Sequence, residues 1–286
     1  MPFFVSKDLR NIVIFSLIAI VLALIIDYAF YAVDGLKDTM GALVWGFIRM
    51  YTPTAAALIV GGPSLLKKYL RINGRVAIVY LAAPFITFAA LSIYLAILLG
   101  AGAFTTRQIM SLLSIPSIDF PAFIALTLFN AYIASLTLNA IFALGEEIGW
   151  RGYLLDKFQS IGMGLVKSSI FVGAIWGVWH ASAIILLGHN YPDNRLAGAF
   201  LFVVFTISAT LPHVFVRNVS SSVLPAASLH GSINAVWGLT ILTTDLPREV
   251  AGLGPIAYAS WTAISLAIYL MVIRGRVLGM RHRGPC

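Results

Sequence analysis

Long runs of apolar residues separated by short polar segments make up most of this chain. A bilayer core takes about 20 apolar residues per helix, and eight runs have about that length. They are Asn11–Val33, Gly41–Gly61, Val76–Leu99, Pro121–Gly145, Ser168–Leu187, Gly198–Val216, Ser222–Thr243 and Pro255–Ile273. The pattern predicts an all-α polytopic bundle of about eight transmembrane helices, which forms one integral membrane domain over residues 1–286. The first run is too long for a signal peptide and is expected to be retained.

The composition agrees with a membrane protein and argues against other classes. Of 286 residues, 60% are hydrophobic and 10% are charged, whereas soluble domains have about 45–50% apolar and about 25% charged residues. The single cysteine, Cys286, excludes an intrachain disulfide and a cysteine-based metal site. The net charge of +8 comes without the dense basic, aromatic-rich run of a nucleic-acid site. We therefore expect membrane lipids, and no nucleic acid, as partners.

The positions of the basic residues predict the orientation of the chain. With a cytoplasmic N-terminus, the cytoplasmic segments hold 14 Lys and Arg residues and the opposite loops hold 4, while Arg49 lies inside a span. This asymmetry follows the positive-inside rule, and an even number of spans places both termini in the cytoplasm. We expect a multi-pass protein of the plasma membrane in a prokaryote, or of the endoplasmic reticulum in a eukaryote.

Ionisable residues within the apolar runs are candidates for function, because they are costly inside a membrane. Glu146 and Glu147 stand side by side at the end of the fourth run. Glu147 and Arg151 are i, i+4 neighbours on a helix and are expected to pair. Glu146 points about 100° away, which leaves its carboxylate free for acid–base work. Asp27 and Arg49 are a second candidate pair, unless Arg49 instead orients a site.

Two histidines lie within later runs, each with a companion one helical turn away. Trp176 shares a helix face with His180, and His230 shares one with Asn234. At about 1.5 Å per residue from the nearest cytoplasmic base, Glu146 lies roughly 16 Å deep and each histidine roughly 20 Å deep. We expect one site at this depth, open to the cytoplasmic half of the membrane.

These residue types suit the hydrolysis of a peptide bond by water. A carboxylate beside a neutral imidazole can take a proton from water, and an imidazole with an amide can donate hydrogen bonds to a developing oxyanion. The sequence contains no His-Glu-x-x-His, Gly-x-Ser-Gly or Gly-x-Gly-Asp motif, which disfavours zincin, rhomboid-like and presenilin-like proteases. A zinc ion held by Glu146, His180 and His230 stays open as an alternative.

Two other classes of function also stay open. Intramembrane Glu and His residues form proton relays in transporters, although the sequence shows none of the internal repeats that many transporters have. Alternatively, the polar clusters only fix helix packing in a non-catalytic membrane scaffold or immunity protein.

Taken together, the three clusters resemble the CPBP intramembrane proteases, the Abi family. It includes type II CAAX prenyl endopeptidases (Rce1-like) and bacteriocin-processing or immunity proteins. Its pattern is Glu-Glu-x-x-x-Arg, then Phe-x-x-x-His, then His-x-x-x-Asn/Asp. The present sequence has these motifs in order, within a protease motif region of about residues 121–243, and Trp176 stands where the family usually has Phe.

The resemblance implies an intramembrane glutamic-type endopeptidase that needs no cofactor. Glu146 would activate water with assistance from His180, and His230 with Asn234 would form the oxyanion hole. The supporting residues implied are Glu147, Arg151 and Trp176. The substrate stays open: a prenylated CaaX protein suits a site that faces the cytoplasm, and a bacteriocin leader or another membrane-associated peptide is an equal alternative. The expected partner is a peptide or a lipidated protein.

Overall fold

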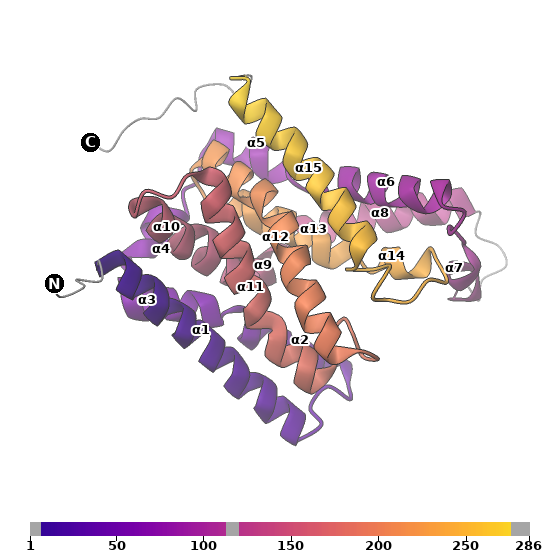
Figure 1. Cartoon of the computed structure of the whole chain (residues 1–286), viewed down its shortest axis with the longest axis horizontal. Helices are drawn as coiled ribbons and strands as arrows, with labels where there is room; N and C mark the ends of the chain where they lie inside the picture. Colours follow the sequence, from indigo (N-terminus) through magenta and orange to yellow (C-terminus); the bar gives the residue numbers. More distant parts are fainter. Residues whose placement is uncertain (1–6, 113–119, 276–286) are drawn as a thin grey trace.

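The computed structural model describes residues 7–112 and 120–275, and helices are its only regular elements in these ranges (Figure 1). The only β-type pairing in the described part is an isolated antiparallel bridge between Phe104 and Thr244. The predicted all-α class is therefore confirmed.

The helices follow one another through short connections. In chain order they are α1 Lys7–Ala32, α2 Thr39–Met50, α3 Thr52–Gly61, α4 Ser64–Tyr69, α5 Gly74–Ala82, α6 Pro84–Gly100, α7 Arg107–Leu112, α8 Phe120–Leu136, α9 Leu138–Glu147, the π-helix η1 Ile148–Leu154, α10 Leu155–Ser160, α11 Leu165–Leu187, α12 Arg195–Ser220, α13 Leu224–Val236, α14 Leu239–Leu242 and α15 Pro255–Ile273. Helices α11 and α12 pack against each other along much of their length, and α13 lies among α5, α6, α8, α9 and α12.

Proline divides two of the predicted spans into paired helices. Pro53 lies in the first turn of α3, and Pro84 begins α6. Proline has no backbone N–H and its ring clashes with the preceding turn, so a helix restarts there. The combined lengths Thr39–Gly61 and Gly74–Gly100 are each still long and apolar enough to cross a membrane.

The number of possible spans is close to the predicted number. Six helices in the described part pass the test of length and hydropathy, and a seventh span is formed if the bent pair Pro121–Leu136 and Leu138–Ser160, at 47°, counts as one. The predicted span Ser222–Thr243 instead forms α13 and α14. A helix of 13 residues is only about 20 Å long, which is shorter than a bilayer core of about 30 Å. Its apolar residues are buried against other helices. This burial inside the bundle explains why the run Ser222–Thr243 is apolar.

The distribution of polar groups fits a lipid environment. Leu17, Ile59 and Phe200 are 58%, 66% and 78% exposed, whereas Glu147 and Arg151 are fully buried. In a water-soluble protein, charged residues are almost never fully buried unless they are paired. Apolar side chains therefore cover the outside, and the charged groups gather within the bundle.

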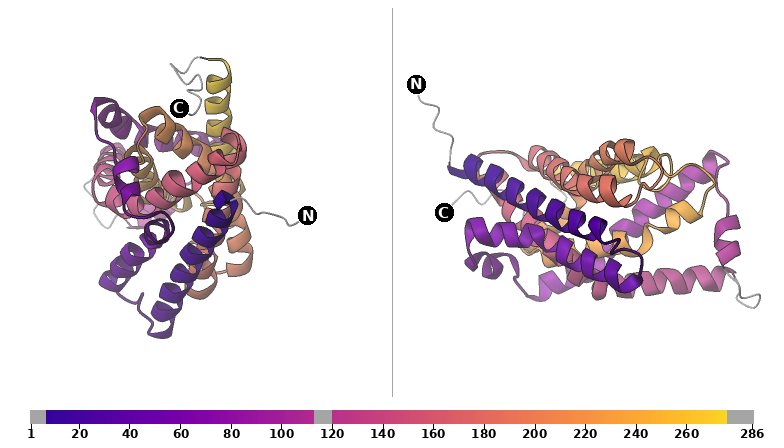
Figure 2. Two further views of the ribbon diagram at one scale, coloured as in Figure 1. Left: turned by 90° about the vertical axis from the view of Figure 1, so that its left-hand side faces the viewer. Right: turned by 90° about the horizontal axis from the view of Figure 1, so that it is seen from below.

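Basic residues from several helices gather at one end of the molecule, here called the basic end. It holds the beginning of α1, α4, α10 and the end of α12 (Figures 1 and 2). Lys157 of α10 contacts Asp8 of α1 at 2.7 Å. Lys68 of α4 and Arg217 of α12 both pair with Asp156. These contacts join basic segments that are far apart in the sequence.

Connecting segments meet at the opposite end, here called the loop end, which comprises residues 101–106, 188–194 and 243–254. Arg107 contacts Asp245 at 3.3 Å, and the Tyr191 hydroxyl donates to the carbonyl of Leu253 at 2.9 Å. Along the chain, segments at the basic end alternate with segments at the loop end. The sequence predicts the same alternation between the two sides of a membrane.

Candidate active site

A cavity of about 500 Å³ lies among α2, α9, α11, α12 and α13. Its deep wall includes Glu146 and Trp176, whose side chains are buried. Its outer wall includes His189, Asn190 and Arg248, which are exposed. These three exposed residues belong to the segments of the loop end, and the exposed Asn234 of α13 lines the same cavity.

The expected opening toward the cytoplasmic half of the membrane stays a prediction, and the exposed residues of the cavity wall lie away from the basic end. Tyr153, Leu154 and Phe158, all at most 4% exposed, pack in a core cluster that fills the bundle toward the basic end. Counting residues from the basic loops gave a depth for each group. This count does not show which end of the bundle is filled by packed side chains.

The structure brings five of the predicted site residues to this one cavity. They are Glu146, Trp176, His180, His230 and Asn234. The other two predicted residues, Glu147 and Arg151, lie behind the cavity wall and are fully buried. Three separate helices, α9, α11 and α13, thus converge on one space.

Glu146 is held by neutral hydrogen-bond donors. Its Oε2 accepts from Trp176 Nε1 at 2.6 Å and from Trp150 Nε1 at 3.3 Å. Trp176 was expected to pack against His180, and it does so with ring centroids 5.9 Å apart, but its indole also orients the carboxylate. Trp150 was missed, although its i, i+4 spacing from Glu146 was a signal for this bond.

His180 presents one ring nitrogen for chemistry. Its Nδ1 lies 2.9 Å from the carbonyl oxygen of Trp176, and because a carbonyl only accepts, Nδ1 must carry the proton. In the neutral imidazole, Nε2 is then the acceptor. The ring packs against Trp179 and Phe202, with centroid distances of 4.6 and 4.3 Å. These contacts fix the plane in which Nε2 points.

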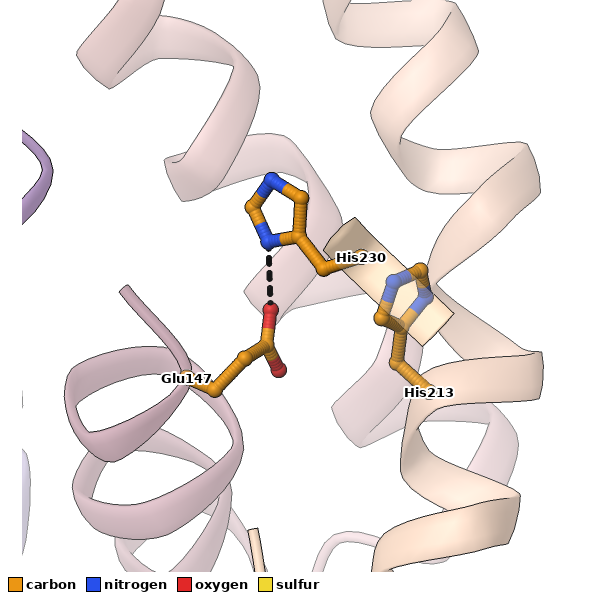
Figure 3. A group of neighbouring side chains, drawn as sticks. All are labelled: Glu147, His213 and His230. Atoms are coloured by element: carbon orange, nitrogen blue, oxygen red, sulfur yellow. Dashed lines mark hydrogen bonds and ion pairs between the residues drawn. The ribbon is translucent and has the colours of Figure 1, made fainter. Parts of the chain in front are cut away.

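Glu147 belongs to a network of charged and polar groups behind the cavity (Figure 3). Its Oε1 accepts from Arg151 Nη1 at 2.9 Å and from His230 Nδ1 at 2.8 Å. The predicted Glu147–Arg151 pair is therefore confirmed. His213 of α12 completes the group, and one nitrogen or oxygen from each of Glu147, His213 and His230 lies within 4.8 Å of the others.

This trio is the one group in the described part that is spaced to hold a metal ion, and it differs from the predicted alternative of Glu146, His180 and His230. Glu147 Oε2 and His213 Nε2 are buried there without a hydrogen-bond partner among the described residues. The guanidinium of Arg151, 2.9 Å from Oε1 of the same carboxylate, repels a second cation. His213 was missed, although an intramembrane histidine in the run Gly198–Val216 was a visible signal.

Asp27 and Arg49 form a second buried pair, as one of the two sequence-based alternatives predicted. Arg49 Nε lies 2.9 Å from Asp27 Oδ1, and Arg49 Nη2 donates to the carbonyl of Trp179 at 2.9 Å. Asp27 also accepts from Trp45 and Ser182. Since Arg49 lines the cavity, the pair places a positive charge in its wall.

Comparison with known proteins identifies the region that contains the three clusters. Residues 128–236 match the family described as type II CAAX prenyl endopeptidase Rce1-like. The matched region is similar to the Rce1-like family. Among curated proteins, the CAAX prenyl protease 2 of Methanococcus maripaludis is 35% identical over 120 residues, which are 40% of this chain and 43% of that relative. The chain therefore matches less than half of that relative's length.

The Rce1-like match covers part of the cavity wall, including His189 and Asn190 of its outer part. Glu146, His180 and Asn234 lie within it, whereas Arg49 and Arg248 lie outside it. Together with the long apolar helices, the match identifies a multi-pass integral membrane protein. The CPBP resemblance of the sequence is confirmed.

Proposed function

We propose that this protein is an intramembrane endopeptidase in which Glu146 and His180 activate water. The observation that carries the proposal is that the buried carboxylate of Glu146 and the imidazole of His180, whose Nε2 is free to accept, line the same cavity. Indole donors occupy Oε2 of Glu146, and Oε1 is left to accept a proton. Neutral donors orient this carboxylate without the competing charge of a direct ion pair.

In this mechanism, water attacks the carbonyl carbon of the scissile bond while Glu146 takes one of its protons. The carbonyl oxygen becomes an oxyanion in a tetrahedral intermediate. The intermediate collapses, the C–N bond breaks, and the proton passes to the departing amine, with His180 assisting the transfer. The products are a new carboxylate and a new amine, so no covalent enzyme intermediate is needed.

His230 and Asn234 are the proposed oxyanion donors. His230 Nδ1 already donates to Glu147, so donation to an oxyanion requires a proton on Nε2 as well, and the imidazolium is the donor form. The adjacent Glu147 carboxylate offsets its positive charge. Asn234, one helical turn further along α13, is accessible in the cavity and can donate from its amide.

For the substrate, we propose a membrane-associated peptide or lipidated protein. The name of the Methanococcus maripaludis relative, CAAX prenyl protease 2, supports a prenylated CaaX peptide as the first probe. The test uses purified protein in detergent, a farnesylated CaaX peptide, its unprenylated form, and product detection by mass spectrometry. We expect a single internal cleavage that Glu146→Gln abolishes.

Two controls make this test specific. Asp34→Asn makes the same carboxylate-to-amide change at an exposed surface pair and should leave cleavage intact. A chelator should have no effect; activity that chelator removes and zinc restores would instead favour metal chemistry at the group of Glu147, His213 and His230. Full activity of Glu146→Gln would contradict the glutamate mechanism.

A further inference from the structure

We propose that Arg49 of α2 is a substrate-binding residue, which holds a carboxylate of the peptide and so positions the scissile bond beside Glu146. The inference rests on the proposed endopeptidase function, which makes the ligand a peptide. Arg49 lies outside the residues that match the Rce1-like family, 128–236, and the water-activating step proposed above does not use it.

Two partners hold the guanidinium of Arg49 in one orientation. Its Nε donates to Asp27 Oδ1 at 2.9 Å, and its Nη2 donates to the carbonyl oxygen of Trp179 at 2.9 Å. The guanidinium carbon also lies 3.8 Å from the centre of the Trp179 ring. Asp27 is fixed in turn by donors from Trp45 and Ser182, at 2.8 and 2.6 Å. The guanidinium is thus preorganised, so that little conformational entropy is lost when it binds a ligand.

This arrangement leaves donors of Arg49 without an acceptor. A guanidinium has five N–H groups, and Nη1 makes no hydrogen bond within the described part of the chain, whereas Nε and Nη2 do. The side chain is only 3% exposed and lines the cavity, so an acceptor reaches Nη1 from the cavity. A carboxylate is the acceptor that matches a guanidinium best, because the two groups can form parallel charge-assisted hydrogen bonds.

The position of Arg49 along α2 places it near both residues that are proposed to activate water. Its Nη2 binds the carbonyl oxygen of the residue before His180. Met50, the next residue of α2, packs against the residue before Glu146: a Cβ atom on Gly145 would lie 2.6 Å from the Met50 carbonyl oxygen. Since Arg49, Glu146 and His180 line one cavity of about 500 Å³, a carboxylate bound by Arg49 is close along the peptide to the bond that is cleaved.

The charge of the cavity wall also suits an anionic ligand. Glu146 is the only acid in the described part of this wall. Arg248, which also lines the cavity, is exposed and forms no ion pair among the described residues. Asp27 binds Arg49 through Nε and leaves Nη1 free. A peptide carboxylate therefore meets two cations in the wall, one of them held rigidly.

The test compares peptides that differ only in the carboxylate. The farnesylated CaaX peptide is prepared with a free C-terminus, as the C-terminal carboxamide, and as a carboxamide whose last residue is aspartate. Binding is measured by fluorescence anisotropy in detergent with the Glu146→Gln protein, so that no peptide is consumed. We expect the free C-terminus, the aspartate side chain or both to bind roughly 10–100-fold more tightly than the plain carboxamide, and the form that does so identifies the source of the carboxylate.

Variants of Arg49 show whether this preference comes from the proposed contact. The double variant Asp27→Asn with Arg49→Gln leaves no unpaired buried charge and should bind carboxylate and carboxamide peptides alike. Arg49→Lys keeps a charge beside Asp27 but lacks the planar fork, and it should lose most of the preference. Arg107→Lys makes the same change at the exposed pair with Asp245 and should keep the preference. Melting temperatures verify that each variant is folded.

Equal binding of all three peptides before any change at Arg49 would overturn the proposal, whether or not the Arg49 variants fold. An unchanged preference in the folded double variant would overturn it as well. Kinetics separate carboxylate binding from a role of Arg49 at the oxyanion. Arg49→Lys should raise KM for the carboxylate peptide with little change in kcat, whereas an equal loss of kcat for carboxylate and carboxamide peptides would contradict the assignment.

The same measurements separate this proposal from the endopeptidase function. If the native protein cleaves none of the peptides, the endopeptidase function fails, and the binding preference still decides whether Arg49 holds a carboxylate. If the native protein cleaves all three peptides with the same kcat/KM, the endopeptidase function stands and the carboxylate site is refuted.

Discussion

Glu146 and Glu147 are neighbours in the chain and are buried almost equally, with 2% and 0% exposure, yet their surroundings differ. Glu146 lines the cavity and accepts hydrogen bonds from two neutral indoles. Glu147 lies outside the cavity and is bound to Arg151 and His230. The type of partner and the access to the cavity, and not burial, separate the carboxylate proposed to be reactive from the one proposed to position its neighbours.

Close helix packing sets this difference. A Cβ atom on Gly149 would come within 2.4 Å of Pro53, and one on Gly145 within 2.6 Å of the carbonyl oxygen of Met50. Glycines on this face therefore let α9 and η1 lie directly against α2 and α3, and they fix the rotation of the helix. With adjacent side chains about 100° apart, this rotation directs Glu146 to the cavity and Glu147 to the network.

The sharpest way to break the comparison is to neutralise each carboxylate separately. Glu146→Gln keeps a carbonyl oxygen for the indole donors, so we expect the melting temperature to be preserved. The loss of a general base should lower kcat by about 10²–10⁴-fold. Glu147→Gln should instead lower the melting temperature clearly and reduce kcat less than Glu146→Gln does. The assays are peptide cleavage and thermal unfolding in the same detergent, and equal losses of activity without a stability difference would refute the division.

The next largest effect is expected from the partner of Glu147. Arg151→Met removes a guanidinium that is fully buried against the carboxylate, and breaking a buried pair on one side destabilises by about 3–5 kcal/mol. The double variant Glu147→Gln with Arg151→Met leaves no unpaired charge and should unfold at a higher temperature than Arg151→Met alone. As a control, Lys37→Met at the exposed pair with Asp34 should hardly change the unfolding curve. A double variant no more stable than Arg151→Met would show that charge pairing is not the cause.

Features of the site that depend on spacing within one helix were predictable from the sequence. The Glu147–Arg151 pair and the shared faces of Trp176 with His180 and of His230 with Asn234 follow from helix periodicity alone. We inferred that these residues meet in one cavity because they lie at similar depths in the membrane on three different helices.

Features that depend on packing between helices were not predictable. The bond from His230 to Glu147 and the proximity of His213 both join residues of different helices. The length of α13 was overestimated because a buried helix and a lipid-facing helix have equally apolar sequences. The direction of the cavity depends on which side chains fill each end, and a single sequence does not contain that information.

The smallest expected effect tests what the indole donors contribute to Glu146. Trp176→Phe keeps an aromatic ring, as in the family pattern, but removes the donor at 2.6 Å from Oε2. A hydrogen bond to a charged group contributes about 1.5–3 kcal/mol, and about 1.4 kcal/mol corresponds to tenfold in rate. We therefore expect kcat to fall by roughly tenfold, with KM changing less. Trp150→Phe removes the longer bond at 3.3 Å and should cost less activity. If Trp150→Phe were the more damaging change, or if Trp176→Phe were as active as the native chain, orientation of Glu146 by Trp176 would not contribute to catalysis.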